Sequence, residues 1–259
     1  MDETKELRYR QLVEDARSHY SVYEEFPEDA PKGLYWYKRC QEINLWTYWQ
    51  GRGNLNAEMM LVGQDWGNPW SADNENFRKK LSNVGDGPIP DYMEGNQNPT
   101  DKNLVELFRK LNCDITQPCD KVFFTNFVLG YRNYGISGGY KRSWAENDRD
   151  CFRRLVEIIE PKGILCLGRS TFEAVLDTFG ASVSPRMKGY NTFISSEQNP
   201  KTIRLGNEKT VAVFAMAHCG AIGTMNRNRG CKGIGQDKLE LQKQDWEKVY
   251  SYISGIKYE

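Results

Sequence analysis

The sequence predicts an α/β protein in which a central, mostly parallel sheet of four strands lies between two layers of helices. The chain has 259 residues, enough for one domain with a sizeable core. Four short apolar runs are nearly continuous rather than alternating, which is typical of strands covered on both faces. Helical patterns separate the runs, and this alternation favours a parallel sheet with helices on both sides. We therefore expect a three-layer α/β/α sandwich, with residues 1–259 as a single domain.

Each predicted strand is a short apolar run, and the four runs are 59–62, 122–128, 163–167 and 211–217. Apolar residues recur at helical spacing in the segments 101–111, 143–159, 170–179 and 237–254. Ser143 and Ser170 each stand three residues before a glutamate, the spacing of a capping box at a helix start. Residues 1–55 are expected to form a mostly helical extension. Residues 82–100, rich in Gly, Pro, Asn and Asp, are expected to form a long surface loop.

The charge is balanced over the chain but unevenly placed. Formal net charge is zero, which excludes a basic field over the whole protein. Residues 186–232 nevertheless hold eight basic and two acidic residues. This segment could form a local basic face that meets phosphate, or it could be an ordinary solvated surface.

The cysteines and the hydropathy pattern bear on the compartment. Seven cysteines are an odd number, and no CxxC pair occurs, so reduced thiols without a disulfide framework or a metal site are the simplest interpretation. The charged start MDETKELRYR does not resemble a signal peptide, and no apolar run approaches the ~18 residues of a membrane helix. We expect a cytoplasmic monomer.

Polar residues stand at the carboxyl ends of three predicted strands. The first strand is followed by Gln64 and Asp65, the second contains Asn126, and the fourth is followed by His218. Ligands of such sheets bind at this edge. Each residue also has a structural interpretation: a turn aspartate, an asparagine that satisfies backbone groups, a structural histidine. Their similar positions on three strands favour a shared site.

Four segments carry a resemblance to a known family. They are VGQDWG, VFFTNFVLGYR, AHCGAIGTMNRNRG, and SWAENDRDCFRRLVEIIEPKGILCLGRSTFEAVL between the last two motifs. Their order and spacing resemble the uracil-DNA glycosylase superfamily over residues 57–250. Each motif alone is short, and their shared order makes the match more specific.

The resemblance implies a role for each residue in cleaving an N-glycosidic bond. Asp65 would stabilise the sugar cation and orient a water, and His218 would donate to the departing base anion. Asn126 would accept from a uracil-type N3–H and donate to O4, which rejects cytosine. Gln64 would add a contact to the base. Phe77 would stack on the base, or it could equally be a core residue. No metal or organic cofactor is implied.

The same resemblance implies contacts to DNA, whose target nucleotide must be flipped out or presented in a single strand. Ile222 stands where the family has a wedge that enters the base stack, although it could instead pack on the core. Arg227, Arg229 and Lys232 would bind backbone phosphates.

Three departures from the family pattern affect what is expected. Gly67 stands where the best-known branch has a tyrosine that excludes the thymine methyl, so thymine, 5-modified uracil and hypoxanthine stay open as bases. HCG replaces HPS after the fourth strand, which changes the rigidity of that loop. Gly130 replaces a cysteine used by iron–sulfur branches, so no cluster is expected.

The sequence thus predicts a monofunctional DNA glycosylase of base excision repair, acting on DNA that contains uracil or another damaged base. A catalytically inactive module that binds a nucleobase or nucleic acid is the alternative. A third hypothesis is an unrelated α/β hydrolase that uses Asp65 and His218 as a pair.

Overall fold

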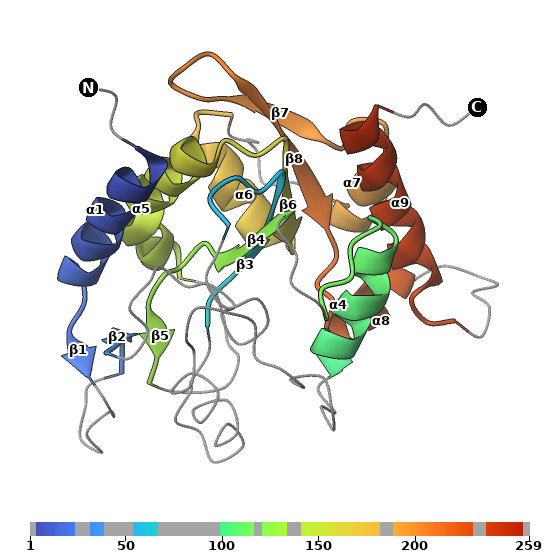
Figure 1. Cartoon of the computed structure of the whole chain (residues 1–259). Coiled ribbons are helices and arrows are strands. Elements are labelled where there is room, and N and C mark those ends of the chain that lie inside the picture. Colours follow the sequence, from blue (N-terminus) through green and yellow to red (C-terminus); the bar gives the residue numbers. More distant parts are fainter. Residues whose placement is uncertain are drawn as a thin grey trace.

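The computed structural model describes residues 4–23, 32–38, 54–66, 99–116, 121–133, 141–181, 189–229 and 237–255 (Figure 1). The helices are α1 (Lys5–Ser18), α4 (Pro99–Arg109), α5 (Arg142–Ile159), α6 (Arg169–Thr178), α7 (Tyr190–Ser195), α8 (Ala221–Asn228) and α9 (Glu240–Ser254). The strands are β1 (Val22–Tyr23), β2 (Leu34–Tyr37), β3 (Met59–Gly63), β4 (Val122–Asn126), β5 (Tyr131–Arg132), β6 (Gly163–Leu167), β7 (Lys201–Arg204) and β8 (Thr210–Met216).

The main sheet is mixed and has five strands in the order β4-β3-β6-β8-β7. The four predicted strands are present and pair in parallel, with Met59 opposite Val122 and Gly163 opposite Ala212. The predicted strand number of four is wrong, because β7 adds an antiparallel edge to β8. Only Ile203 of its four residues is buried, so this edge strand lacks the continuous apolar run of its neighbours.

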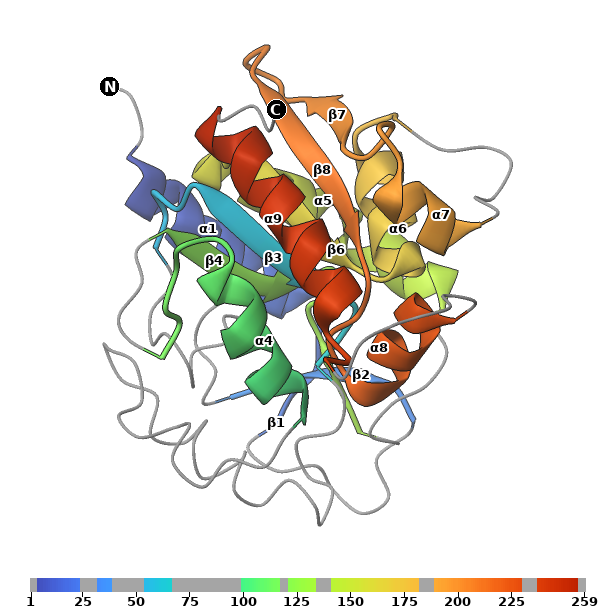
Figure 2. The same cartoon turned by 90° about the vertical axis from the view of Figure 1, so that its right-hand side faces the viewer.

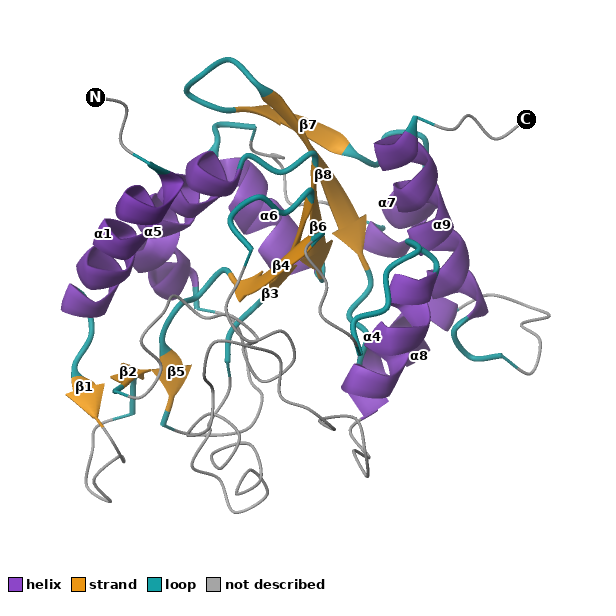
Figure 3. Ribbon diagram, in the orientation of Figure 1, coloured by secondary structure: helices purple, strands orange, loops and turns teal. Residues whose placement is uncertain are grey.

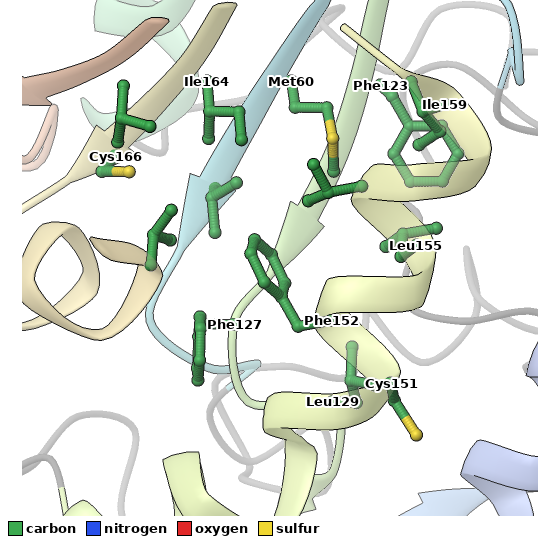
Figure 4. Packing of buried hydrophobic residues seen from close by; sticks show 14 of the residues in the cluster. Met60, Phe123, Phe127, Leu129, Cys151, Phe152, Leu155, Ile159, Ile164 and Cys166 are labelled. Atoms are coloured by element: carbon green, nitrogen blue, oxygen red, sulfur yellow. The ribbon is translucent and has the colours of Figure 1, made fainter. Parts of the chain in front are cut away.

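Helices cover both faces of this sheet, as Figures 2 and 3 show. Alternate strand residues point to opposite faces. Met60 and Val62 belong to a buried cluster with side chains of α1, α5, α6 and α7. Met59 and Leu61 belong to a second cluster with side chains of α4 and α9. Figure 4 shows Phe152 of α5 against the strands of the first cluster.

A smaller sheet of β1, β2 and β5 lies apart from the main sheet (Figure 3). β1 pairs with β2 in parallel, and β2 pairs antiparallel with β5. The described part of residues 1–55 therefore contains α1 and these two short strands. The segment between β4 and β5 is tied to α5, because the buried Asp148 accepts hydrogen bonds from the Tyr20 hydroxyl and from Leu129 N. This tie fixes the direction in which the chain leaves the main sheet toward β5.

Two predicted helix starts are wrong. α5 begins at Arg142 and α6 at Arg169, so Ser143 and Ser170 lie inside the first turns, and neither helix has a side-chain cap. β6 instead turns directly into α6 through Gly168, whose φ of 97° favours glycine. The predicted loop at 82–100 lies outside the described residues except for the first two residues of α4. Within the described residues, no helix is both long and apolar enough to cross a membrane.

Candidate active site at the carboxyl edge of the sheet

Asp65 is held by both the backbone and side chains at the end of β3. The ladder with β4 continues past the strand, since Phe127 N donates to Gly63 O at 2.9 Å and Val128 N to Gln64 O at 3.0 Å. The carboxylate oxygen Oδ2 of Asp65 accepts from Gln64 Nε2 at 2.7 Å. The strand therefore delivers a carboxylate whose main chain and side chain are both restrained.

Arg132 of β5 forms an ion pair with this carboxylate. Its Nη2 lies 2.5 Å from Asp65 Oδ2, and the side chains of Arg132 and Asp65 are only 2% and 7% exposed. The Arg132 guanidinium lies 4.9 Å from the ring centroid of Trp144 on α5, a cation–π distance. Tyr131, the neighbour of Arg132, stacks on Trp66 with 5.7 Å between centroids. The ion pair and the aromatic rings beside it thus connect the end of β3 with β5 and α5.

Asn126 lies directly opposite Gly63 in the parallel ladder. Its amide occupies the space where a side chain at position 63 would be, because a Cβ there would come within 2.1 Å of Asn126 Oδ1. Asn126 is 3% exposed, and within the described residues its side chain makes no hydrogen bond. A ligand with a complementary edge would satisfy this amide.

His218 follows β8 on the far side of β6 from β3. Gly220 N–H donates to its Nδ1 at 2.9 Å, so the neutral ring carries its proton on Nε2. Solvent reaches the imidazole, yet protein atoms surround it closely enough that desolvation lowers its pKa below the ordinary value of about 6.5. The ring is therefore a neutral hydrogen-bond donor at neutral pH.

Asp65 and His218 do not contact each other. No hydrogen bond joins them, and two strand spacings separate β3 from β8, roughly 10 Å. This separation argues against the third hypothesis, which needs a directly paired aspartate and histidine. The separation is compatible with Asp65 and His218 contacting one ligand from different sides.

α8 begins three residues after His218 and presents apolar side chains outward. Ile222 is 72% exposed and Met225 is 58% exposed. The alternative that Ile222 packs on the core is therefore wrong. Gly223 lets the helix lie against the His218 backbone, because a Cβ at this position would come within 2.0 Å of His218 O. In Figure 1, α8 and β5 both lie below the main sheet.

The predicted phosphate ligands differ in their surroundings. Arg229 is exposed at the end of α8 and has no ion pair within the described residues. Arg227 is buried and forms a two-point ion pair with Asp245 of α9, at 2.7 and 2.8 Å, while also donating to Ser195 Oγ at 2.6 Å. The expectation that Arg227 binds phosphate is corrected: its guanidinium joins α7, α8 and α9.

Other basic residues of the 186–232 segment are also paired. Arg204 lies 2.9 Å from Glu208, and Lys209 lies 2.5 Å from Glu160. The segment therefore offers a less basic surface than its composition indicates. Arg229 is its exposed basic residue closest in sequence to Ile222, the predicted wedge.

Three predicted site residues lie outside the described residues: Gly67, Phe77 and Lys232. Within the described part of the chain, no group of three or more His, Cys, Asp or Glu side chains could hold a metal ion. Gly130 packs so closely on Tyr20 that a Cβ would come within 2.5 Å of its ring. A cysteine at this position would require the Tyr20 ring to move.

Two residues next to predicted site residues had no predicted role: Arg132, which pairs with Asp65, and Met225, which is exposed near Ile222 on α8. Arg132 is the last residue of the motif VFFTNFVLGYR. Its link to Asp65 depends on the small sheet, in which β5 pairs with β2. Met225 lies three residues from Ile222, which is the spacing of one helix face. A helical interpretation of residues 221–228 would have found Met225.

No protein-family model matches the sequence, and a search of curated proteins gives no match either.

Proposed function

We propose that this chain is a DNA glycosylase that hydrolyses the N-glycosidic bond of uracil or a related deaminated or mismatched base. The observation that carries the proposal is the buried Asn126 side chain, which makes no hydrogen bond in the described residues. It ends β4 beside β3, the strand that Asp65 follows, and His218 follows β8 at the same edge of the sheet. The proposal includes a three-layer α/β/α sandwich, a monomer in the cytoplasm, and a role in base excision repair without a cofactor.

Asn126 reads the base in this proposal. A planar amide accepts from N3–H and donates to O4 of a uracil-type edge, whereas cytosine presents the opposite pattern. The β3–β4 ladder holds Asn126 against Gly63. Its amide therefore has little freedom to turn over and present the donor and acceptor pattern that cytosine needs. A polar site of this kind discriminates strongly because a mismatched ligand leaves buried groups unpaired.

Asp65 and His218 each stabilise one of the two opposite charges that develop as the bond breaks. Positive charge on the sugar is stabilised by the Asp65 carboxylate, which also orients the attacking water. Negative charge on the departing base is stabilised by the Nε2–H of a neutral His218. Arg132 keeps the carboxylate in place through the ion pair at 2.5 Å. Ile222 on α8 fills the gap left by the flipped nucleotide.

The test is base release from oligonucleotides that carry uracil, hypoxanthine or a T·G mismatch, in single and double strands. Alkali cleaves the abasic product, and gel electrophoresis measures it. We expect cleavage of at least the uracil substrate. Complete absence of cleavage on every substrate would reject the glycosylase.

The Asp65–Arg132 pair also favours a second candidate, a module that binds a nucleobase or nucleic acid without cleaving it. A carboxylate engaged by a buried arginine exerts a weaker field on a sugar cation. This module would bind DNA with a salt-dependent affinity and release no base. Filter binding of the same oligonucleotides separates the two candidates.

A further inference from the structure

The loop that carries His218 is held by two helices that are distant in the sequence. Asn103 on α4 donates through Nδ2 to Cys219 O at 2.7 Å. Gln242 on α9 donates through Nε2 to His218 O at 3.3 Å, and Ala217 O lies 3.5 Å from the same nitrogen. Three successive carbonyl groups therefore accept hydrogen bonds from the side chains of Asn103 and Gln242.

The orientation of the Gln242 amide follows from its partners. Carbonyl oxygens only accept hydrogen bonds, so the amide nitrogen faces Ala217 and His218. Its oxygen then faces Thr224 of α8, whose hydroxyl donates to Gln242 Oε1 at 2.8 Å. Gln242 and Thr224 are both buried. One amide thus joins α9 to the end of β8 and to α8.

The imidazole of His218 takes its orientation from this backbone. Its Nδ1 accepts from Gly220 N–H, so rotation of the peptides between them would turn the ring. Glycine adds conformational freedom that folding must remove, whereas a proline would fix φ. The Cys219–Gly220 sequence therefore needs an external constraint, and the side chains of α4 and α9 supply it.

The geometry points to Gln242 as a positioning residue that, together with Asn103, fixes the imidazole of His218 and supplies the rigidity that proline would give this loop. The inference rests on the proposed function, because it takes His218 as the donor to the leaving base. Gln242 touches no substrate. It acts by holding the His218 carbonyl and α8 in one arrangement.

Nitrogen NMR of the imidazole tests this directly, because the ring nitrogens report which of them carries the proton. The chain has two histidines, so His19→Gln leaves His218 as the single imidazole. In that background, Gln242→Met removes the amide at nearly constant side-chain length. Gln244→Met is the matched control, because Gln244 is exposed on the same helix and donates to Glu240.

We expect one tautomer, with the proton on Nε2, in the background protein and in Gln244→Met. Gln242→Met should show a mixture of both tautomers, and its kcat for base release should fall roughly 10- to 100-fold with KM nearly unchanged. An unchanged tautomer in Gln242→Met overturns the inference, whatever the activity.

Thr224→Val gives a second variant in case Gln242→Met does not fold. It removes only the hydroxyl that orients the Gln242 amide, and it should shift the tautomer ratio in the same direction. A single tautomer in this variant contradicts the inference. The NMR measurement needs no substrate, so a failure of the proposed function, seen as no base release by the unaltered protein, is distinguishable from a failure of His218 positioning.

Discussion

Asp65 and Arg132 form a buried ion pair, with Arg132 Nη2 2.5 Å from Asp65 Oδ2. The two residues come from different sheets, because β3 belongs to the main sheet and β5 to the small one. The pair therefore makes the position of the proposed catalytic carboxylate depend on how the small sheet is docked. It also means that the two side chains stabilise each other inside the protein.

Replacement of Arg132 should be costly for stability. Arg132→Met leaves Asp65 as a buried charge without its arginine, and loss of one partner of a buried pair typically costs about 3–5 kcal/mol. Urea unfolding measures the change. Arg109→Met is the control, because the pair of Arg109 with Glu106 is exposed and should contribute at most about 0.5 kcal/mol. Equal effects of the two substitutions would contradict a special role for Arg132.

Asn126 should be dispensable for stability and essential for activity. Asn126→Leu replaces a buried amide that makes no hydrogen bond in the described residues with an apolar side chain of similar size. Such a change is typically neutral or stabilising, so Tm should stay the same or rise. Base release should fall by at least 10²-fold, since the reading group is gone. A large drop in Tm that parallels the activity loss would instead show that Asn126 is structural.

The activity should vary with pH as the fraction of His218 in its neutral form varies. Desolvation lowers its pKa below about 6.5, so kcat/KM should be flat at neutral pH and fall as pH drops through the pKa of the folded state. The unfolded chain binds this proton more readily than the folded protein does. The contribution of neutral His218 to folding stability is therefore complete above pH 6.5 and is lost as the pH falls through the pKa of the folded state. His218→Gln keeps an N–H donor and should abolish this acid limb. Activity that rises as the pH falls would contradict the assignment.

The two arginines near the end of α8 should behave differently. Arg229→Ala should weaken DNA binding for all sequences and reduce the slope of log affinity against log salt by about 1. Arg227→Met should mainly destabilise the fold, by about 3–5 kcal/mol, because it breaks the pair with Asp245. Fluorescence anisotropy at several salt concentrations and urea unfolding separate these effects. A salt slope unchanged by Arg229→Ala would remove Arg229 from the DNA interface.

Much of the main sheet could be predicted because burial on both faces leaves a clear pattern. β3, β4, β6 and β8 are continuous apolar runs for this reason. β7 could not be found in the same way, because an edge strand covered on one face buries only Ile203. The start of α6 was misplaced because its position is set by the turn at Gly168, and a nearby Ser-x-x-Glu spacing carries no information about that turn.

The sequence could identify those site residues whose place is set by the end of a strand. Asp65, Asn126 and His218 were recognised because each stands at a strand end. The pairing of Arg132 with Asp65 depends on β5 and could not be read from spacing. The burial of Arg227 follows from the helical face that it shares with Thr224, whereas the sequence analysis predicts no helix at residues 221–228.

The most direct test of the central claim is the single-turnover rate of base release from a uracil oligonucleotide by the unaltered protein and by Asp65→Asn. Asp150→Asn, an exposed substitution on α5, serves as the control. The account predicts that Asp65→Asn slows release about 10²- to 10³-fold, while oligonucleotide binding and the Asp150→Asn rate stay near the unaltered values. Release by Asp65→Asn at the unaltered rate, or no release by the unaltered protein, would contradict it.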